Sequence, residues 1–573
     1  MHDVLNAQDW ELPTELASAV HEELDRWVAD KNVARVWARD ATLWTGGDEA
    51  RWLGWLDTIE QQQAELSVRA ELATAFRDEN VTDLLLLGMG GSSLGPEVIG
   101  RIIGAAPGFP RLHVLDSTDP CQVRSVEAHL DLTKTAVIVA SKSGTTLEPN
   151  IFHAYFFERV KERLGARRAG GRFVAITDPG SRLEQIAARD GFRATVLGVP
   201  SIGGRYSVLS PFGTVPCALI GVDLADFLTR ASVMATACRA DSPTNPGLRL
   251  GVALGVAALR GRDKLTIIAS PALAPLGAWL EQLIAESTGK SGLAIIPVDL
   301  ERAAEPDLYG HDRLFVYVRF RPAPGDEEDA RVDALIGAGQ PVVRIDVGEA
   351  YDLAQELFRW EMATAVAGAV MGINPFDQPD VEASKVETRA LTDAFEATGK
   401  LPPEVALCDS DGLRLFADAA NAEALAVDPE ASVTEWLRAH FGRLRPGDYF
   451  ALLAYVEMSD ANTGLLQQIR HTVRDRVHVA SCLGFGPRFL HSTGQAYKGG
   501  PNIGVFLQIT CDDAADLPVP GQRYTFGVVK AAQARGDFDV LAGRGRRALR
   551  VHMESDVARG LAILADMVTD VLR

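Results

Sequence analysis

Short apolar runs alternate with amphipathic stretches from about residue 80 onward, and this rhythm is typical of parallel sheets covered by helices. A first series predicts strands over Asp83–Leu87, Leu112–Leu115, Ala136–Ala140, Phe173–Ile176 and Ala194–Val199. A second series predicts strands over Leu265–Ala269, Ala294–Val298, Phe315–Phe320 and Val342–Asp346. Most of these runs are apolar without alternation, as expected where both faces of a sheet are buried. We therefore predict an α/β fold with two parallel sheets covered by helices.

The ends of the chain depart from this rhythm. Apolar residues at four-residue steps predict a helical segment at 1–75, which precedes a first α/β domain at 76–222 and a second at 223–573. An acidic, alanine-rich stretch at about 399–447 is predicted to be a peripheral insert of the second domain. The C-terminal extension is predicted to lengthen the second sheet, with strands at Tyr449–Val456, Val477–Ala480, Val505–Ile509 and Ala548–Val551 and a last helix at Val557–Leu572.

Composition restricts the possible partners. The 573 residues carry a formal net charge of −20, which repels nucleic acids and anionic membranes. The six cysteines form no CxxC pair, which favours reduced thiols in a cytoplasm. The N-terminus lacks the pattern of a signal peptide, and no apolar run reaches the roughly 20 residues of a membrane span. We predict a cytoplasmic protein in which any anionic ligand needs a local positive site.

The stretch Val137–Asn150, VIVASKSGTTLEPN, predicts such a site. A buried strand leads into a loop of small residues, and a helix is predicted from about Leu147 to Leu164. Backbone N–H groups and the positive end of the helix dipole converge at a turn of this kind. Hydroxyls, one ammonium and one glycine join them: Ser141, Lys142, Ser143, Gly144, Thr145 and Thr146. A simple helix cap is the alternative, but a cap needs one hydroxyl and this loop has four.

The glycine-rich turn Gly88–Gly95 also follows a predicted strand. Its third fingerprint position for dinucleotide binding is Ser93 instead of glycine, so that motif fails. A better interpretation is a wall for a sugar, at which Gly91 lets the backbone approach and Ser92 donates a hydrogen bond.

Four further segments could carry chemistry. Arg205 follows two glycines and could stabilise an anionic oxygen, or form a surface salt bridge. Gln282 and Glu286 lie four residues apart on one helix face; Glu286 could be a general base or a solvated carboxylate. Lys385 would ordinarily face solvent, and His491 could be an acid–base group or a structural histidine. The sequence shows no zinc or Walker A pattern, so we predict no metal.

Together, GMGGSSLGP, SKSGTTLEP, GGRYS, QLIAESTGK and INPFDQPDVE resemble the glucose-6-phosphate isomerase family. HSTGQAYKGGPN resembles the form of that isomerase fused to transaldolase in some bacteria. The resemblance implies two sugar isomerase (SIS) domains and an active site between the subunits of a dimer. It implies that Gly91, Ser92, Gln282 and the Ser141–Thr146 loop bind the substrate. It further implies that Glu286 moves a proton between C2 and C1, that Arg205 stabilises the enediol, and that Lys385 and a histidine open the sugar ring.

Two features of the C-terminal motif leave the ring-opening group open. The histidine follows the NPFDQ segment instead of preceding it, and Tyr497 stands where relatives of this form often have histidine. Both His491 and Tyr497 are therefore candidates.

We predict interconversion of glucose 6-phosphate and fructose 6-phosphate by a cytoplasmic homodimer without a cofactor, a nucleic acid or a membrane. The alternatives are an enzyme that also isomerises mannose 6-phosphate, a non-catalytic SIS protein that senses sugar phosphates and, least favoured, a dinucleotide enzyme.

Overall fold

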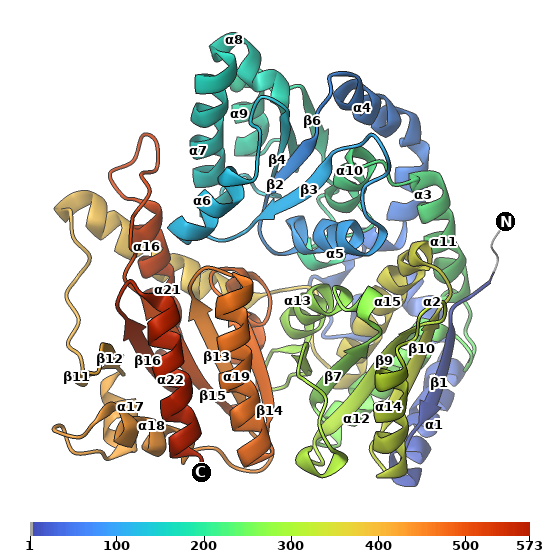
Figure 1. Cartoon of the computed structure of the whole chain (residues 1–573). Coiled ribbons are helices and arrows are strands. Elements are labelled where there is room, and N and C mark those ends of the chain that lie inside the picture. Colours follow the sequence, from blue (N-terminus) through green and yellow to red (C-terminus); the bar gives the residue numbers. More distant parts are fainter. Residues whose placement is uncertain (1–3) are drawn as a thin grey trace.

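The computed structural model describes residues 4–573, which form three sheets packed around a common centre (Figure 1). We call each sheet with its helices a unit. The first unit spans residues 83–197, the second contains residues 7–11 and 264–347, and the third spans residues 408–571. The α/β fold with parallel, helix-covered sheets is confirmed. In the described part of the chain we find no helix both long and apolar enough to cross a membrane.

The first unit is a five-stranded parallel sheet in the order β3-β2-β4-β5-β6. Its strands are β2 (Asp83–Leu87), β3 (Arg111–Leu115), β4 (Thr135–Ala140), β5 (Phe173–Thr177) and β6 (Ala194–Leu197). Its helices are α5 (Leu94–Ile103), α6 (Pro120–Ala128), α7 (Leu147–Leu164), α8 (Ala166–Ala169) and α9 (Arg182–Asp190). Alternate residues of β2 and β4 enter two different hydrophobic cores, which explains why these strands are apolar throughout.

The second unit has the strand order β1-β10-β9-β7-β8. Its strands are β1 (Ala7–Glu11), β7 (Lys264–Ala269), β8 (Ile296–Val298), β9 (Arg313–Phe320) and β10 (Val342–Val347). Its helices are α13 (Leu276–Thr288) and α14 (Asp326–Gly337). The prediction that residues 1–75 are helical is wrong for β1, which pairs antiparallel with β10. A five-residue strand that finds its partner more than 300 residues away leaves little local signal.

A shell of further helices covers the first two units. It consists of α1 (Thr14–Ala29), α2 (Asn32–Trp37), α3 (Thr58–Ala64), α4 (Leu66–Asp78), α10 (Pro211–Leu219), α11 (Leu224–Ala237), α12 (Pro246–Leu259) and α15 (Leu353–Met371). Two buried tryptophans, Trp55 and Trp27, belong to the same large core as the inner residues of both sheets. This core makes the first and second units one packed body.

The third unit corrects our prediction for the C-terminal strands. They do not extend the second sheet but form a separate one, in the order β11-β12-β16-β15-β13-β14. Its strands are β11 (Cys408–Ser410), β12 (Leu413–Phe416), β13 (Tyr449–Tyr455), β14 (Ala480–Phe485), β15 (Gly504–Cys511) and β16 (Arg547–Met553). Its helices are α17 (Ala419–Leu425), α18 (Val433–Phe441), α19 (Asp460–Val477), α20 (Gly494–Gly499), α21 (Phe526–Gly543) and α22 (Val557–Val571).

Two details of this unit also differ from expectation. The strand predicted at Val477–Ala480 lies too early, because α19 continues to Val477 and β14 begins at Ala480. The acidic stretch 399–447 contains β11 and β12, and β12 pairs antiparallel with β16. This stretch therefore supplies the edge of the third sheet.

The three sheets share one arrangement of their parallel strands. In each, the first parallel strand in the chain lies between the second and the third, and the fourth lies beyond the third. Successive crossovers therefore run in opposite directions from the first strand, which leaves a crevice at the carboxyl ends of the first and third strands. A helix outside the sheets, α16 (Pro379–Thr398), packs along α21 and links the second unit to the third.

Candidate active site

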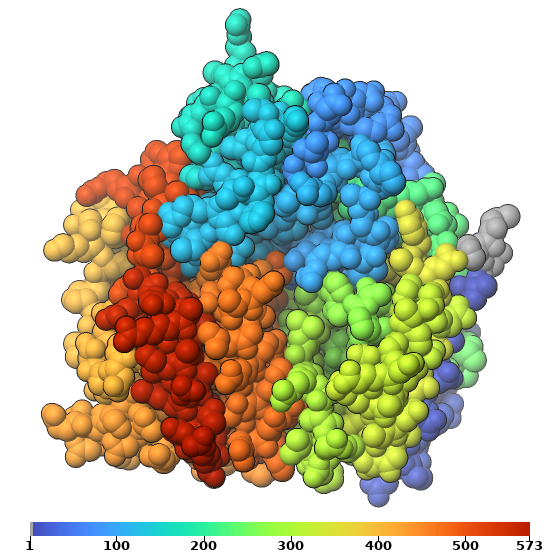
Figure 2. Space-filling view, viewed as in Figure 1, coloured from blue at the N-terminus to red at the C-terminus, as the bar shows by residue number. Residues whose placement is uncertain are grey.

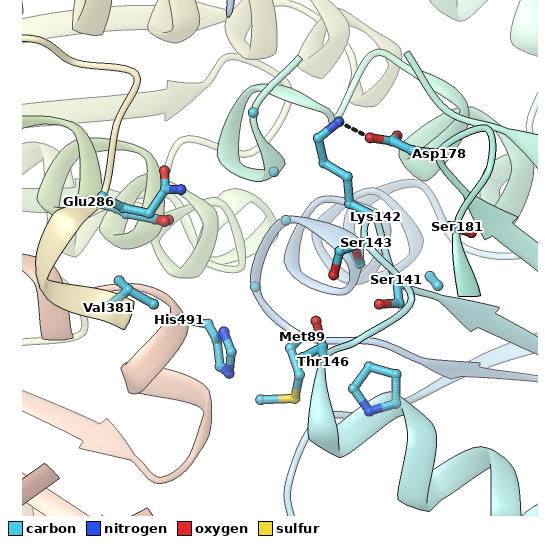
Figure 3. A pocket seen from close by; sticks show the side chains of 18 of the residues that line it. Met89, Ser141, Lys142, Ser143, Thr146, Asp178, Ser181, Glu286, Val381 and His491 are labelled. Atoms are coloured by element: carbon cyan, nitrogen blue, oxygen red, sulfur yellow. Dashed lines mark hydrogen bonds and ion pairs between the residues drawn. The ribbon is translucent and has the colours of Figure 1, made fainter. Parts of the chain in front are cut away.

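A cavity of about 530 Å³ opens between the three units, beside the loops that follow β2 and β4. This volume suits a small metabolite. The predicted site residues that line it are Gly91, Ser92, Ser141, Lys142, Ser143, Thr146, Gln282, Glu286, Lys385 and His491. Gly144 and Thr145 belong to the same loop as their neighbours, and Arg205 lies behind Glu286. One cavity thus brings together residues that are up to 400 positions apart (Figure 3).

The loop Ser141–Thr146 forms one wall of the cavity, which we call the anion wall. Ser141 is 4% exposed, and its hydroxyl has no hydrogen-bond partner among the described residues. Thr146 precedes α7, yet within residues 4–573 its side chain makes no capping hydrogen bond. Two hydroxyls at the positive end of an 18-residue helix are therefore available to a ligand. The helix-cap alternative does not account for them.

Lys142 and Gly144 hold this loop in shape. The Lys142 ammonium pairs with Asp178 and donates to the carbonyl of Pro200 at 3.2 Å (Figure 3). Its charge is thus already balanced by a carboxylate. Gly144 has a φ of +68°, and a Cβ there would lie 2.4 Å from the backbone nitrogen of Leu183. The loop therefore requires glycine at this position.

The glycine turn after β2 contacts a second glycine turn. A Cβ on Gly91 would lie 1.8 Å from the carbonyl oxygen of Gly204, so these two backbones touch directly. Ser92 is 9% exposed and lines the cavity beside them. This contact places Arg205, the residue after Gly204, against the second unit.

The opposite wall, which we call the proton-transfer wall, holds Glu286 near the end of α13. Its Oε2 accepts a hydrogen bond from Gln282 at 3.0 Å, and its Oε1 lies 3.3 Å from Nη1 of Arg205. Arg205 is 1% exposed and donates to Ser287 at 2.7 Å and to the backbone carbonyl groups of Pro375 and Asp377. These bonds fix a positive charge beside one oxygen of the only slightly exposed carboxylate.

His491 belongs to the same wall and comes from the third unit. Its Nε2 lies 3.0 Å from Oε1 of Glu148, and its backbone carbonyl accepts from Gln282 at 2.9 Å. Burial alone raises the pKa of Glu148, but the charge and hydrogen bond of His491, together with Lys385, lower that pKa below its usual value. An ionised Glu148 accepts from His491 and so orients the imidazole ring.

The two remaining ring-opening candidates lie in different surroundings. The Lys385 ammonium lies on α16 and pairs with Glu382 at 2.7 Å; both residues line the cavity. Tyr497 is 2% exposed and packs against Tyr449 and Phe506 in the core of the third unit. The structure thus separates Tyr497 from the cavity and places His491 in it.

Sequence reasoning missed Glu148, Asp178 and Lys290. Glu148 lies two residues after the anion loop, and a glutamate in the first turn of a helix is common enough to be taken for a dipole partner. Burial and the neighbouring Arg205 lower the pKa of Lys290 to about 7. Its ammonium donates to the carbonyl groups of Ser287 and Asn374 at 2.8 Å each, and so anchors the NPFDQ segment under the site.

Comparisons with a family model and with known proteins point to the same family. Residues 59–301 match the model of the family described as phosphoglucose isomerase. The chain is 31% identical over 379 residues to a glucose-6-phosphate isomerase of Rubrobacter xylanophilus; the match covers 87% of that protein and 58% of this chain. It is 30% identical to the enzyme of that name from Thermus thermophilus, covering 93% of it and 61% of this chain.

Solved structures agree on the fold. A hypothetical protein from Thermus thermophilus has a TM-score of 0.57 at 27% identity, over 67% of this chain and 99% of the other. A glucose-6-phosphate isomerase from Chlamydia trachomatis has a TM-score of 0.52 at 23% identity, over 59% of this chain and 74% of the other.

Proposed function

The chain belongs to the glucose-6-phosphate isomerase family, and we propose that it interconverts glucose 6-phosphate and fructose 6-phosphate in the cavity between its three units. The observation that carries this proposal is the pairing of two walls. A loop at a helix N-terminus, in which the hydroxyl of Ser141 has no hydrogen-bond partner among residues 4–573, faces a carboxylate that an arginine holds in place. The first can bind a phosphate, and the second can move a proton.

The reaction follows from these positions. His491, oriented by Glu148, and Lys385 transfer protons at the ring oxygen and the anomeric hydroxyl and so open the ring. Glu286 then takes the proton from C2 and returns it to C1, while a hydroxyl proton moves between O1 and O2. The charge that develops on the enediol lies near Arg205, whose guanidinium is already fixed by buried acceptors. All steps are proton transfers without net oxidation, so we propose no cofactor.

The test is formation of fructose 6-phosphate from glucose 6-phosphate, together with exchange of the C2 hydrogen with solvent deuterium. Both are expected for the wild type. Binding of sugar phosphates without turnover or exchange would instead identify a non-catalytic sensor.

We also propose a location, a class of partner and an oligomeric state, on the basis of the family resemblance and of the net negative charge of the chain. The enzyme acts in the cytoplasm, its partner is a sugar phosphate rather than a nucleic acid or a membrane, and it assembles as a homodimer. The mass of the purified protein in solution tests the last of these. Mannose 6-phosphate as a second substrate is tested in the same assay.

A further inference from the structure

We propose that the third unit completes the active site within a single chain, so that no residue from a second copy is needed for turnover. This inference rests on the proposed function. The resemblance implies a site between subunits, but the cavity in one chain already has both walls. His491 and Glu286 line it (Figure 3), and so does Lys385.

The segment with His491 is fixed against the second unit by buried polar contacts. Gln495 donates to the carbonyl of Gly289 at 2.9 Å and to Asp380 at 2.8 Å, and it accepts from the backbone nitrogen of Asp380. A Cβ on Gly289 would lie 2.2 Å from the Cα of Ala496, so α20 and the end of α13 are in direct backbone contact. Glu286 lies three residues before that glycine. The two proton-transfer residues are therefore held together through adjoining backbones.

Two hydrophobic cores extend across the boundaries of the third unit. One contains Ile296 and Val298 of the second unit together with Tyr449 and Leu453 of the third. The other contains Phe152 of α7 and Phe526 of α21, whose rings stack at 6.1 Å. Figure 2 shows the third unit pressed against the other two without a gap in this view. Cores of this kind make the unit a permanent part of the site.

The comparison with related proteins is consistent with a part of this chain that those proteins lack. The Rubrobacter and Thermus enzymes match 58% and 61% of this chain, although they are themselves matched over 87% and 93% of their lengths. The part of this chain that matches the family model ends at residue 301, well before His491.

Complementation between inactive variants tests the proposal. Glu286→Gln and His491→Ala chains carry different affinity tags, are produced in the same cells and are isolated through both tags in turn. If the site forms between subunits, the doubly tagged dimers regain about half of wild-type activity, since all of them are mixed and each mixed dimer holds one intact site of two. If each chain forms its own site, activity stays at the level of the separate variants.

Recovered activity in the doubly tagged fraction overturns the proposal. Failure to isolate mixed assemblies, with an active wild-type monomer, supports it because one chain then suffices. A wild type that does not turn over glucose 6-phosphate contradicts the proposed function instead. The control is the double variant Glu286→Gln with His491→Ala on one chain, coproduced with wild type, which keeps half of the wild-type activity only if sites do not mix.

A separate observation assigns a positioning role to Gln533 on α21. The structure places its side-chain amide, 2% exposed, between the first and third units. Thr118 donates to its Oε1 at 2.7 Å, and its Nε2 donates to Oε1 of Glu148 at 2.7 Å. The same Glu148 oxygen lies 3.0 Å from Nε2 of His491. Because an ionised Glu148 can only accept, the amide nitrogen must face Glu148, and the amide oxygen then accepts from the Thr118 hydroxyl.

We infer that Gln533 holds Glu148 as the acceptor that orients His491 for ring opening. Gln533→Leu removes this donor and should lower kcat on glucose 6-phosphate about tenfold or more, with KM changed less than twofold. Turnover of an aldose phosphate too short to close a ring should fall less than twofold. The matched control is Gln508→Leu, a buried glutamine on β15 that donates to the carbonyl of Ala534 and has no contact with Glu148 among the described residues.

Both variants lose a buried hydrogen bond and should lose similar thermal stability. A selective loss on the cyclic substrate for Gln533→Leu alone supports the assignment. Equal losses in both variants, or equal losses on both substrates, overturn it.

Discussion

The anion wall and the proton-transfer wall face each other across one cavity, but they are built in different ways. The anion wall is a single six-residue loop, Ser141–Thr146, shaped by one glycine and the start of one helix. The proton-transfer wall is assembled from Arg205 before the second sheet, Glu286 in the second unit and His491 in the third. Binding therefore depends on local geometry, whereas chemistry depends on how distant elements pack. Variants of the two walls should separate KM from kcat.

The largest effect is expected at Glu286. Glu286→Gln keeps the shape and the contacts of the side chain but cannot accept a proton, and loss of a general base costs on the order of 10²–10⁴ in rate. Isomerisation and exchange of the C2 hydrogen with deuterium should both nearly vanish, while a sugar-phosphate competitor still binds within severalfold. Deuterium exchange near the wild-type rate would show that Glu286 is not the base.

The next effect separates the two ring-opening candidates. His491→Ala should slow turnover of cyclic glucose 6-phosphate by about 10²-fold, because it removes an acid–base group. An open-chain aldose phosphate should be affected much less. Tyr497→Phe should leave kcat within about threefold, since Tyr497 lies in the core rather than in the cavity. Comparison of kcat on the two substrates checks this, and the opposite ranking would exchange the two roles.

On the anion wall, KM should change more than kcat because a phosphate is bound alike before and during reaction. Ser141→Ala combined with Thr146→Val should raise KM tenfold or more, since these hydroxyls are available to a ligand. Lys142→Ala combined with Ser143→Ala should also raise KM, but less, because Asp178 already neutralises the lysine. Steady-state kinetics of the two double variants provide the comparison. An unchanged KM in both would show that this loop does not bind the phosphate.

The smallest effect concerns acid stability of the unit that carries His491. Burial lowers the pKa of His440 to about 3 in the folded protein, compared with 6.5 when exposed. The unfolded state therefore binds more protons between these values, so stability falls as pH drops below 6.5. His440→Leu should flatten the decrease of Tm between pH 7 and pH 4, measured by calorimetry. Parallel curves for variant and wild type would exclude this histidine as a cause.

The same contrast explains what the sequence could predict. The anion wall is contiguous, and the predicted helix Leu147–Leu164 agrees with α7 at both ends. Ser141 and Thr146, in the loop before this helix, were therefore identified as candidate anion ligands from the local pattern. The pairing of His491 with Glu148 spans 343 positions and carries no local signal. The residues alone therefore left His491 open between an acid–base and a structural role, and the family resemblance favoured the first.

The missed third sheet has a similar cause. Strand patterns predicted β13, β15 and β16 within a few residues, but which sheet a strand joins depends on its hydrogen-bonding partners. β14 was misplaced because Val477 and His478 have the appearance of a strand start, although they end α19. Arg205 was recognised, but its position behind Glu286 depends on the backbone contact of Gly91 with Gly204.

The pairing of β1 with β10 has a consequence for the order in which the protein matures during synthesis. Residues Ala7–Glu11 leave the ribosome long before their partners Val342–Asp346, so this first strand must wait while more than 300 residues are translated. The second sheet gains its last strand only then, and His491 arrives later still. Newly made chains therefore pass through a stage in which the residues of the anion loop have been made but His491 has not.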